Sequence, residues 1–572
     1  MRHPAPARRL AAMSLVALGL VCASTRAWGQ RLASSPEREA RHAQRDFEFL
    51  RRAFLPRVPA RTGGCDVYIG EMCYWDNNDD PPLPPERPRV ASAREHLRAS
   101  LDSLGALDSS NDYIAGQRVR YALDAGDPAA AAHAVDHCGA TPWWCHALRG
   151  LALHRAGNEA ASAAVFDTAL AEMPDTLRCA WLDVRPWTPP GTRVDKADPK
   201  DCAARAATSA RVLWMAAPLL SWRHDAARDE FFSRRTWAKV LTGTVSPMFT
   251  SLRWDIEELG LRMGWPDQWA LEDRLIGSTQ FPDPHVVGME PQPSFSVVPD
   301  RDALEAPFSA KPNDWRLRGD RGARMRYAPG WLRSIDTLPV QIARFRRPGD
   351  SMVVVAVYDG QTLLDSGSTA LVATALLSAG PEPDSTLAIG LTTTAPTGAI
   401  ILRAPARPAL GAVEVFDSVA RRAARWRAGI APLPDSAPIS DLLVGRAGSR
   451  FEPASPDDAA RTATPRMQFT ARDTLALYWE TYLHSPPGIQ TRVTVRLTRA
   501  AGLFGRVARM AGFGHGRSGP ALSWDDPEPD SIPARSLRFG LDGVPPGRYR
   551  LEVIVQTPRS RGTAARDIEV VD

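Results

Sequence analysis

The chain is poor in lysine and in long apolar segments. Only four of its 70 basic residues are lysines, so arginine carries nearly all of the positive charge, a usage typical of GC-rich bacterial genomes. Beyond the N-terminal segment, the longest apolar run covers residues 370–379. A membrane-spanning helix needs roughly 18–20 apolar residues, so we expect no integral membrane segment in the mature protein.

Familiar catalytic motifs are also missing. The chain has no G-x-x-x-x-G-K-[ST] phosphate loop, no H-E-x-x-H zinc motif and no G-x-S-x-G nucleophile elbow. Glu257 and Glu258 are adjacent, so their carboxylates would not share one face of a helix. The sequence therefore offers no catalytic residue, no cofactor-binding residue and no set of metal ligands, and whether the protein is an enzyme stays open.

Residues 1–29 have the three parts of a secretory signal peptide. Arginines stand at the start, an apolar run follows over Leu10–Val21, and small residues occupy the −3 and −1 positions of a cleavage site after Gly29. A lipoprotein anchor at Cys22 is the weaker alternative, because Val21 stands where lipid modification requires a small residue. We expect an exported protein, either periplasmic or extracellular.

The net charge changes once this segment is removed. The full chain has 70 basic and 65 acidic residues, a charge of +5. The signal segment carries four arginines and no acid, which leaves 66 minus 65, or +1, for the mature chain. Nucleic-acid binding requires a concentrated basic surface, so the charge gives no reason to expect that partner.

Six cysteines follow the predicted cleavage site. An even number in an exported protein favours disulfides. Proximity along the chain suggests three pairs: Cys65–Cys73, Cys138–Cys145 and Cys179–Cys202. The alternative is a zinc site in which His137 and His146 join the middle pair. Adjacent ligands such as His137 and Cys138 point in divergent directions on a helix, which favours the disulfides.

The N-terminal half is predicted to be helical. Residues 30–110 combine a cysteine-bounded loop, a proline-rich spacer over 79–89 and helices. Residues 111–205 contain two helix–glycine turn–helix units, whose turn glycines, Gly126 and Gly157, are 31 residues apart. This spacing resembles that of tetratricopeptide repeats. A plain helical bundle is the alternative, and two units would need neighbouring helices to cover their ends.

The resemblance to tetratricopeptide repeats implies a concave binding face. The first helix of each unit usually lines that face, and the exported chain would then bind a protein or peptide partner there. The candidate partner-binding residues on these helices are Arg118, Arg120, Tyr121, His146 and Arg149. For Tyr121, structural packing is the favoured role.

Residues 206–334 form a tryptophan-rich middle region. Twelve of the 17 tryptophans lie between Trp143 and Trp331. Clustered tryptophans can stack on sugars or anchor a partner, and they can equally fill an irregular core. A carbohydrate-binding or hydrolytic site near Trp254 to His285 is therefore the alternative to a purely structural role.

After about residue 335 the apolar pattern changes to a period of two. Short β-branched segments separated by Gly, Pro and Asp turns predict an antiparallel, immunoglobulin-like β-sandwich half. We expect a first β module over 335–430 and a C-terminal β-sandwich module over 431–572. A helical interruption at Asp417 to Ala428 and prolines over 432–438 are expected to separate them.

Three segments together resemble the bacterial GWxTD-domain family. They are Ala217–Leu219 followed by Arg228–Arg235, then Leu261–Asp267, and Ile439–Leu443 with the later strands. The Gly-Trp-x-Thr-Asp pentapeptide itself is absent, and Gly264-Trp265-Pro266-Asp267 takes its place. The resemblance implies an exported bacterial protein of unassigned activity. We expect a non-catalytic interaction or assembly scaffold of the cell envelope; an exported hydrolase or carbohydrate-binding protein is the alternative.

Overall fold

The computed structural model describes most of the chain beyond residue 34. The described residues are 35–59, 67–69, 72–75, 84–189, 192, 201–221, 225–247, 257, 260–262, 264, 266, 268–273, 285–289, 298–315, 332, 334–363, 371–393, 396–482, 491–500, 518–526 and 534–572. The predicted signal segment, Cys22 and Cys65 lie outside them, so the predicted Cys65–Cys73 pair is not described. So does most of the segment from Trp254 to His285.

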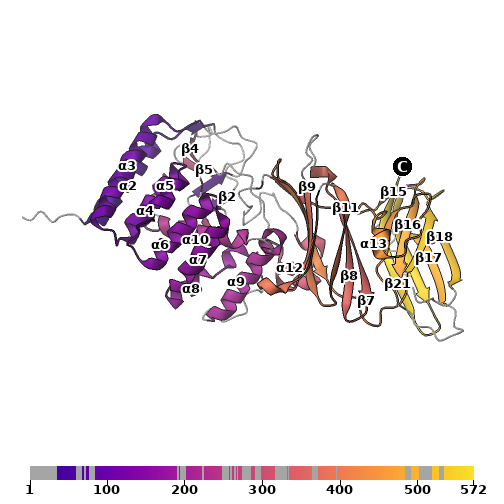
Figure 1. Cartoon of the computed structure of the whole chain (residues 1–572). Helices are drawn as coiled ribbons and strands as arrows, with labels where there is room; N and C mark the ends of the chain where they lie inside the picture. Colours follow the sequence, from indigo (N-terminus) through magenta and orange to yellow (C-terminus); the bar gives the residue numbers. More distant parts are fainter. Residues whose placement is uncertain are drawn as a thin grey trace, which may run out of the picture.

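The N-terminal half is built from helices (Figure 1). They are α2 (Pro36–Ala53), α3 (Pro88–Leu107), α4 (Asp112–Asp124), α5 (Pro128–His133), α6 (Pro142–Arg155), α7 (Glu159–Glu172), α8 (Asp175–Trp181), α9 (Cys202–Ala216) and α10 (Ala226–Leu241), with the short turns η1 (Arg185–Trp187) and η3 (Pro218–Ser221). Asn111 and Asp127 cap α4 and α5 with side-chain oxygens. Gly126 and Gly157 have φ of 73° and 75°, a left-handed conformation that glycine adopts without strain.

A small sheet and a few short turns connect the helices to the β half. Its strands are β1 (Arg57–Val58), β2 (Val67–Ile69), β3 (Met72–Trp75), β4 (Gln268–Glu272) and β5 (His285–Met289), in the order β1-β4-β5-β3-β2. The chain then passes through α12 (Arg301–Glu305), η4 (Pro307–Ser309) and η5 (Pro312–Trp315). Segments about 200 residues apart in sequence thus share one sheet, as in the pairing of Arg57 with Leu271.

Residues 334–430 form two sheets that face each other. One has the order β10-β9-β12-β13-β6 and the other β11-β8-β7. The strands are β6 (Ser334–Thr337), β7 (Val340–Arg347), β8 (Ser351–Asp359), β9 (Leu371–Ser378), β10 (Thr386–Thr393), β11 (Thr397–Pro405), β12 (Ala409–Asp417) and β13 (Arg422–Ile430), with turns η6 (Gln361–Leu363) and η7 (Pro383–Ser385). Side chains of β8, β9, β11 and β12 fill the core between them.

Residues 443–571 form a second pair of sheets, β14-β16-β19 and β15-β21-β20-β17-β18. The elements are β14 (Leu443–Arg446), α13 (Pro456–Ala460), β15 (Gln468–Thr470), β16 (Thr474–Glu480), β17 (Thr491–Arg499), β18 (Ser518–Asp526), β19 (Ala534–Gly540), β20 (Gly547–Gln556) and β21 (Arg561–Val571). Val493, Val495 and Leu497 point into the core, while Arg492 and Arg496 point to solvent, as the period of two predicts.

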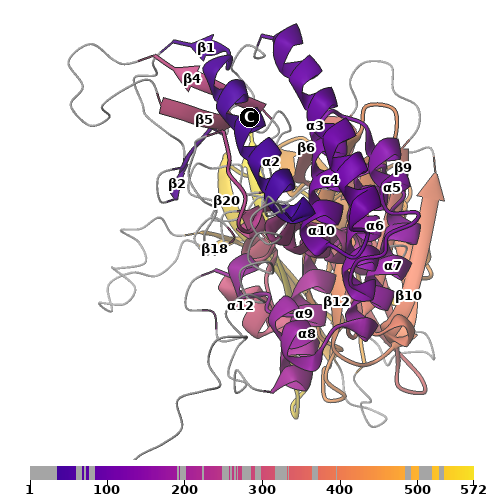
Figure 2. The ribbon, with the colours of Figure 1, turned by 90° about the vertical axis from the view of Figure 1, so that its left-hand side faces the viewer.

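The helices and the four sheets of residues 334–571 form one continuous stack (Figure 1). Leu376 of β9 and Leu410 of β12 belong to the core of the helical half, and the turns η3, η4 and η5 of that half cover one face of the first sheet. Phe345 of β7 packs against Tyr478 of β16, which joins the two sandwiches. Strand β8 is consequently buried on both faces. Figure 2 shows the helices in front of the sheets along the same axis.

The predicted order of a helical half followed by a β half is confirmed. The helical interruption expected at Asp417 to Ala428 is wrong, because Arg422–Ile430 is strand β13. Alanine and arginine favour helix in isolation, but this segment pairs with β12 on one side and β6 on the other. Tertiary pairing outweighs the local preference there. Within the described residues no helix is long and apolar enough to cross a membrane.

Two of the three predicted disulfides are present. Cys138–Cys145 joins the end of the α5 region to α6, with Cα atoms 5.8 Å apart. Cys179–Cys202 joins α8 to α9, with Cα atoms 5.2 Å apart. Both pairs are those that sequence proximity suggested.

The pairing of Cys179 with Cys202 predicts a specific product of trypsin digestion without reductant. Cleavage after arginine and lysine should leave peptide 179–193 linked to peptide 201–205, and mass spectrometry should detect the pair. Adding a reductant to the same digest should separate the two peptides. Detection of either cysteine linked to Cys138 or Cys145 would contradict the pairing.

Candidate functional site

Helix α10 covers the face that the first helices of the two units would present to a partner. Gln117 of α4 donates a hydrogen bond from Nε2 to the Val240 carbonyl of α10, at 2.8 Å. His154 of α6 contacts Glu230 of α10, with 2.7 Å between Nε2 and Oε2. The open concave face expected from the sequence is therefore occupied by the chain itself.

The segment after α10 continues this cover along α2 and α4. The side-chain amide of Gln44 in α2 makes two hydrogen bonds to the backbone of Val245. Its Nε2 donates to the Val245 carbonyl at 2.7 Å, and its Oε1 accepts from the Val245 amide at 3.2 Å. Arg41 donates to the Gly243 carbonyl at 3.0 Å, and Arg120 donates to the Val245 carbonyl at 3.4 Å. Side chains of two helices thus bind the main chain of the turn that follows α10.

Arg120 and Tyr121 consequently do not face a partner. Their exposed fractions are 3% and 0%. The Arg120 guanidinium lies 2.9 Å from Oε1 of Glu48, and the Tyr121 hydroxyl donates to the same oxygen at 2.8 Å. Burial raises the pKa of Glu48, while Arg120 opposes that shift. The assignment of these two residues to a partner surface is wrong, because both are part of a buried polar network.

A second ion cluster lies beside this network. Asp124 accepts hydrogen bonds from Arg51 at 3.2 Å and from Arg94 at 2.9 Å. Burial acts to raise the pKa of Asp124, but the two guanidiniums outweigh it and hold the pKa below its ordinary value. The cluster forms the floor of a cleft of about 420 Å³ that also includes Phe54 and Trp269. Opposite charges are matched there, which indicates a structural role.

The other three candidate residues are at least partly accessible and lie apart from one another. Arg118 pairs with Asp102 at 2.7 Å and lines a small cleft of about 210 Å³. His146 contacts Glu172 of α7, with 2.8 Å between Nδ1 and Oε2. Arg149 is exposed and has no ion pair with any residue that the structure describes. The structure does not bring these side chains together into one site.

A larger polar cleft lies where α2, α4 and α6 begin and α10 ends. Its volume is about 450 Å³, and its walls include Glu37, Arg41, Asp112, Trp144 and Lys239. We call it the polar cleft. It continues the groove that holds the segment after α10, because Arg41 contributes to both.

The two carboxylates of the polar cleft are engaged within its walls. Glu37 forms an ion pair with Arg41 at 2.8 Å and accepts from the Asn111 amide at 3.2 Å, and these contacts lower the pKa of Glu37. Asp112 accepts from the backbone amide and the hydroxyl of Thr141, at 2.9 and 3.1 Å. Both carboxylates thus stabilise the helix N-termini around them.

Lys239 differs from the other charged residues of the polar cleft. Its ammonium lies 5.4 Å from the ring centroid of Trp143 and 5.1 Å from that of Trp144. The side chain is exposed and has no anionic partner among the residues that the structure describes. Sequence reasoning missed it, although the scarcity of lysine in this arginine-rich chain could have drawn attention to it.

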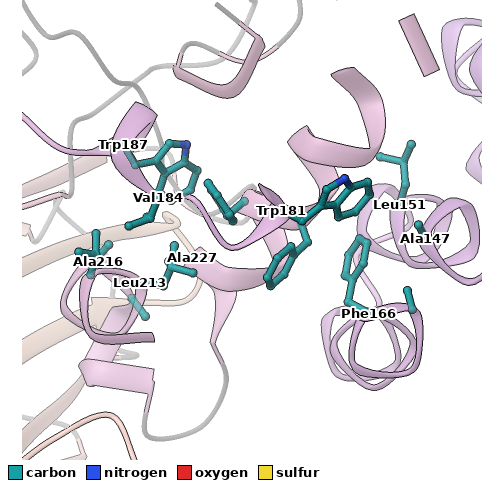
Figure 3. Close-up of a cluster of buried hydrophobic side chains, with 14 of the residues drawn as sticks. Ala147, Leu151, Phe166, Trp181, Val184, Trp187, Leu213, Ala216 and Ala227 are labelled. Atoms are coloured by element: carbon teal, nitrogen blue, oxygen red, sulfur yellow. The ribbon is translucent and has the colours of Figure 1, made fainter. Parts of the chain in front are cut away.

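Most of the described tryptophans between Trp143 and Trp331 fill the core. Trp181 packs with Leu151, Ala147 and Phe166, as Figure 3 shows, and Trp187 lies in the same cluster. The indole of Trp187 donates to the Leu261 carbonyl at 2.6 Å. Buried rings cannot stack on a sugar, so these residues give no support to a carbohydrate site. No group of three metal-ligating side chains occurs among the described residues.

Comparisons with known proteins do not identify the chain. No family model matches it, and no curated protein does. Among solved structures, dimeric latent PorU from Porphyromonas gingivalis has 14% identity and a TM-score of 0.20, over 41% of this chain and 20% of that one. The FN1–FN3 domains of chicken CNTN1 have 10% identity and a TM-score of 0.13, over 42% and 67%. Escherichia coli alpha-2-macroglobulin activated by porcine elastase has 11% identity and a TM-score of 0.14, over 42% and 22%. The chain thus spans about a fifth of the PorU chain.

The contact between His154 and Glu230 predicts sensitivity to acid. Burial acts to raise the pKa of Glu230, but Arg234 and His154 outweigh it and hold the pKa far below 4.5. A carboxyl whose pKa is depressed on folding stabilises the fold above its unfolded pKa, and that stability is lost as the pH falls. Between pH 5 and pH 3 the wild-type Tm should fall by several °C more than that of Glu230→Gln. An equal fall in both proteins would contradict this role.

Proposed function

We propose that the chain is an exported bacterial protein that acts as a non-catalytic interaction or assembly scaffold of the cell envelope. The observation that carries the proposal is the continuous stack of a helical end and two β-sandwiches. Such a body can hold a partner at a fixed distance from a second attachment point. Preformed surfaces lose little conformational entropy on association, which favours binding.

The two disulfides and the signal-like segment 1–29 support export, because disulfides persist in oxidising compartments. The finer assignments belong to the same proposal. They are tetratricopeptide-like units over 111–205, immunoglobulin-like β modules, and a divergent relation to the GWxTD-domain family. The partner would be a protein or peptide of the envelope.

Chemical cross-linking in intact cells of the source bacterium tests this proposal. The tagged full-length protein is cross-linked, purified under denaturing conditions and analysed by mass spectrometry. We expect one or a few envelope proteins enriched over an exported, tagged control protein of similar size. Recovery of uncross-linked protein alone, from cells in which it is folded and oxidised, would contradict a scaffold function.

A further inference from the structure

The polar cleft has an excess of positive potential. Three helices begin at its walls and one ends there. Each helix N-terminus is equivalent to roughly half a positive charge and each C-terminus to roughly half a negative charge, so the three N-termini outweigh the single C-terminus. Arg41 and Lys239 add two cations, while Glu37 and Asp112 add two carboxylates. Both carboxylates are already bound by groups of the walls. Lys239 is therefore the charge that remains available to a ligand.

The same groove already binds main chain, that of the turn after α10. Its walls bind the main chain of residues 243–245 through the side chains of Arg41, Gln44 and Arg120. These bonds are made to backbone carbonyls, so they do not depend on the side chains of the bound segment. Arg41 also lines the open part of the cleft, and its side chain is 43% exposed, so its guanidinium is a donor that the main chain of a peptide can reach.

We propose that the polar cleft binds a segment of a partner protein that carries an acidic side chain, with the carboxylate at Lys239. The inference rests on the scaffold function proposed above and names the chemistry of its partner. A carboxylate there gains a charge-assisted hydrogen bond from the ammonium, which the indoles of Trp143 and Trp144 hold at the mouth of the cleft. The mature chain has 66 basic and 65 acidic residues, a net charge of +1, which disfavours a nucleic acid as the partner.

Fluorescence anisotropy with a defined probe tests the inference. The probe is a fluorescein-labelled peptide of three Ser-Glu repeats, and its control has three Ser-Gln repeats. The full mature protein should bind the acidic probe at least about tenfold more tightly than the control, with an affinity that weakens as salt is raised. Lys239→Gln should weaken binding of the acidic probe about tenfold.

The matched control is Lys311→Gln, which removes the same charge from an exposed position outside the cleft. Its affinity should stay within about twofold of wild type. Because Lys239 is exposed, its replacement leaves the core intact, and circular dichroism confirms this. No binding of the acidic probe, or equal binding by wild type and Lys239→Gln, would overturn the inference. If an envelope partner is still captured by cross-linking, the scaffold function survives that failure.

Discussion

Replacing Arg427 with methionine is expected to lower the free energy of unfolding by about 3–5 kcal/mol, since one partner of a buried ion pair is removed. The guanidinium has no exposed surface and binds Glu414 at 2.6 Å. It also donates to the carbonyls of Met215 and Ala217, at the end of α9. The substitution leaves a carboxylate and two carbonyls unpaired where the helices meet the first sheet.

Denaturant unfolding followed by tryptophan fluorescence measures this effect. The control is Arg403→Met, because the Arg403 side chain is 66% exposed and its pair with Asp457 lies at the surface. We expect a change of less than about 1 kcal/mol for that control. Equal stability of the two variants would show that Arg427 does not hold the helical half to the sheet.

The second large effect is expected at the junction of the two sandwiches. Glu480 is 3% exposed and binds Arg347 at 2.7 Å, and its oxygens accept from the hydroxyls of Tyr478 and Tyr482 at 3.2 and 2.8 Å. Burial and the Glu480 carboxylate both raise the pKa of each tyrosine, so the phenols remain donors. Glu480→Ala should cost about 3 kcal/mol and separate the melting of the two modules.

Differential scanning calorimetry tests this prediction. Glu552→Ala is the control, because Glu552 lies on the outer face of the last sheet and pairs with Arg496 across neighbouring strands. Glu552→Ala should lower the free energy of unfolding by less than about 1 kcal/mol and should show no new melting transition. An unchanged profile for Glu480→Ala would mean that this network does not couple the modules.

Strands that are solvated on one face could be predicted from the sequence. β17 (Thr491–Arg499) alternates apolar and polar residues, and its burial follows the predicted period of two. Strand β9 is harder to predict from the sequence, because Leu371–Ser378 is mostly buried on both faces and shows no period of two. Its second face is covered by the turn η3, a contact that arises only when the helical half packs on the sheet. The same packing turned the expected helix at β13 into a strand.

The candidate site could be predicted from the sequence only in part. Arg120 does bind main chain, as a groove residue would, but the main chain is that of Val245. A contact across 125 residues leaves no local pattern in the sequence. Lys239 enters the site only because α10 packs against α4 and α6. Residue types could therefore suggest a groove, while only the fold shows which part of it is open.

Site-specific photo-cross-linking in cells tests the central claim most directly. A photoreactive amino acid replaces Ser110, an exposed residue at the polar cleft, and in a second protein replaces Thr563 on the exposed face of β21. The account predicts a discrete adduct with an envelope protein from position 110, lost in Lys239→Gln and absent from position 563. No adduct at position 110, or the same adducts at both positions, would contradict recognition by the helical end.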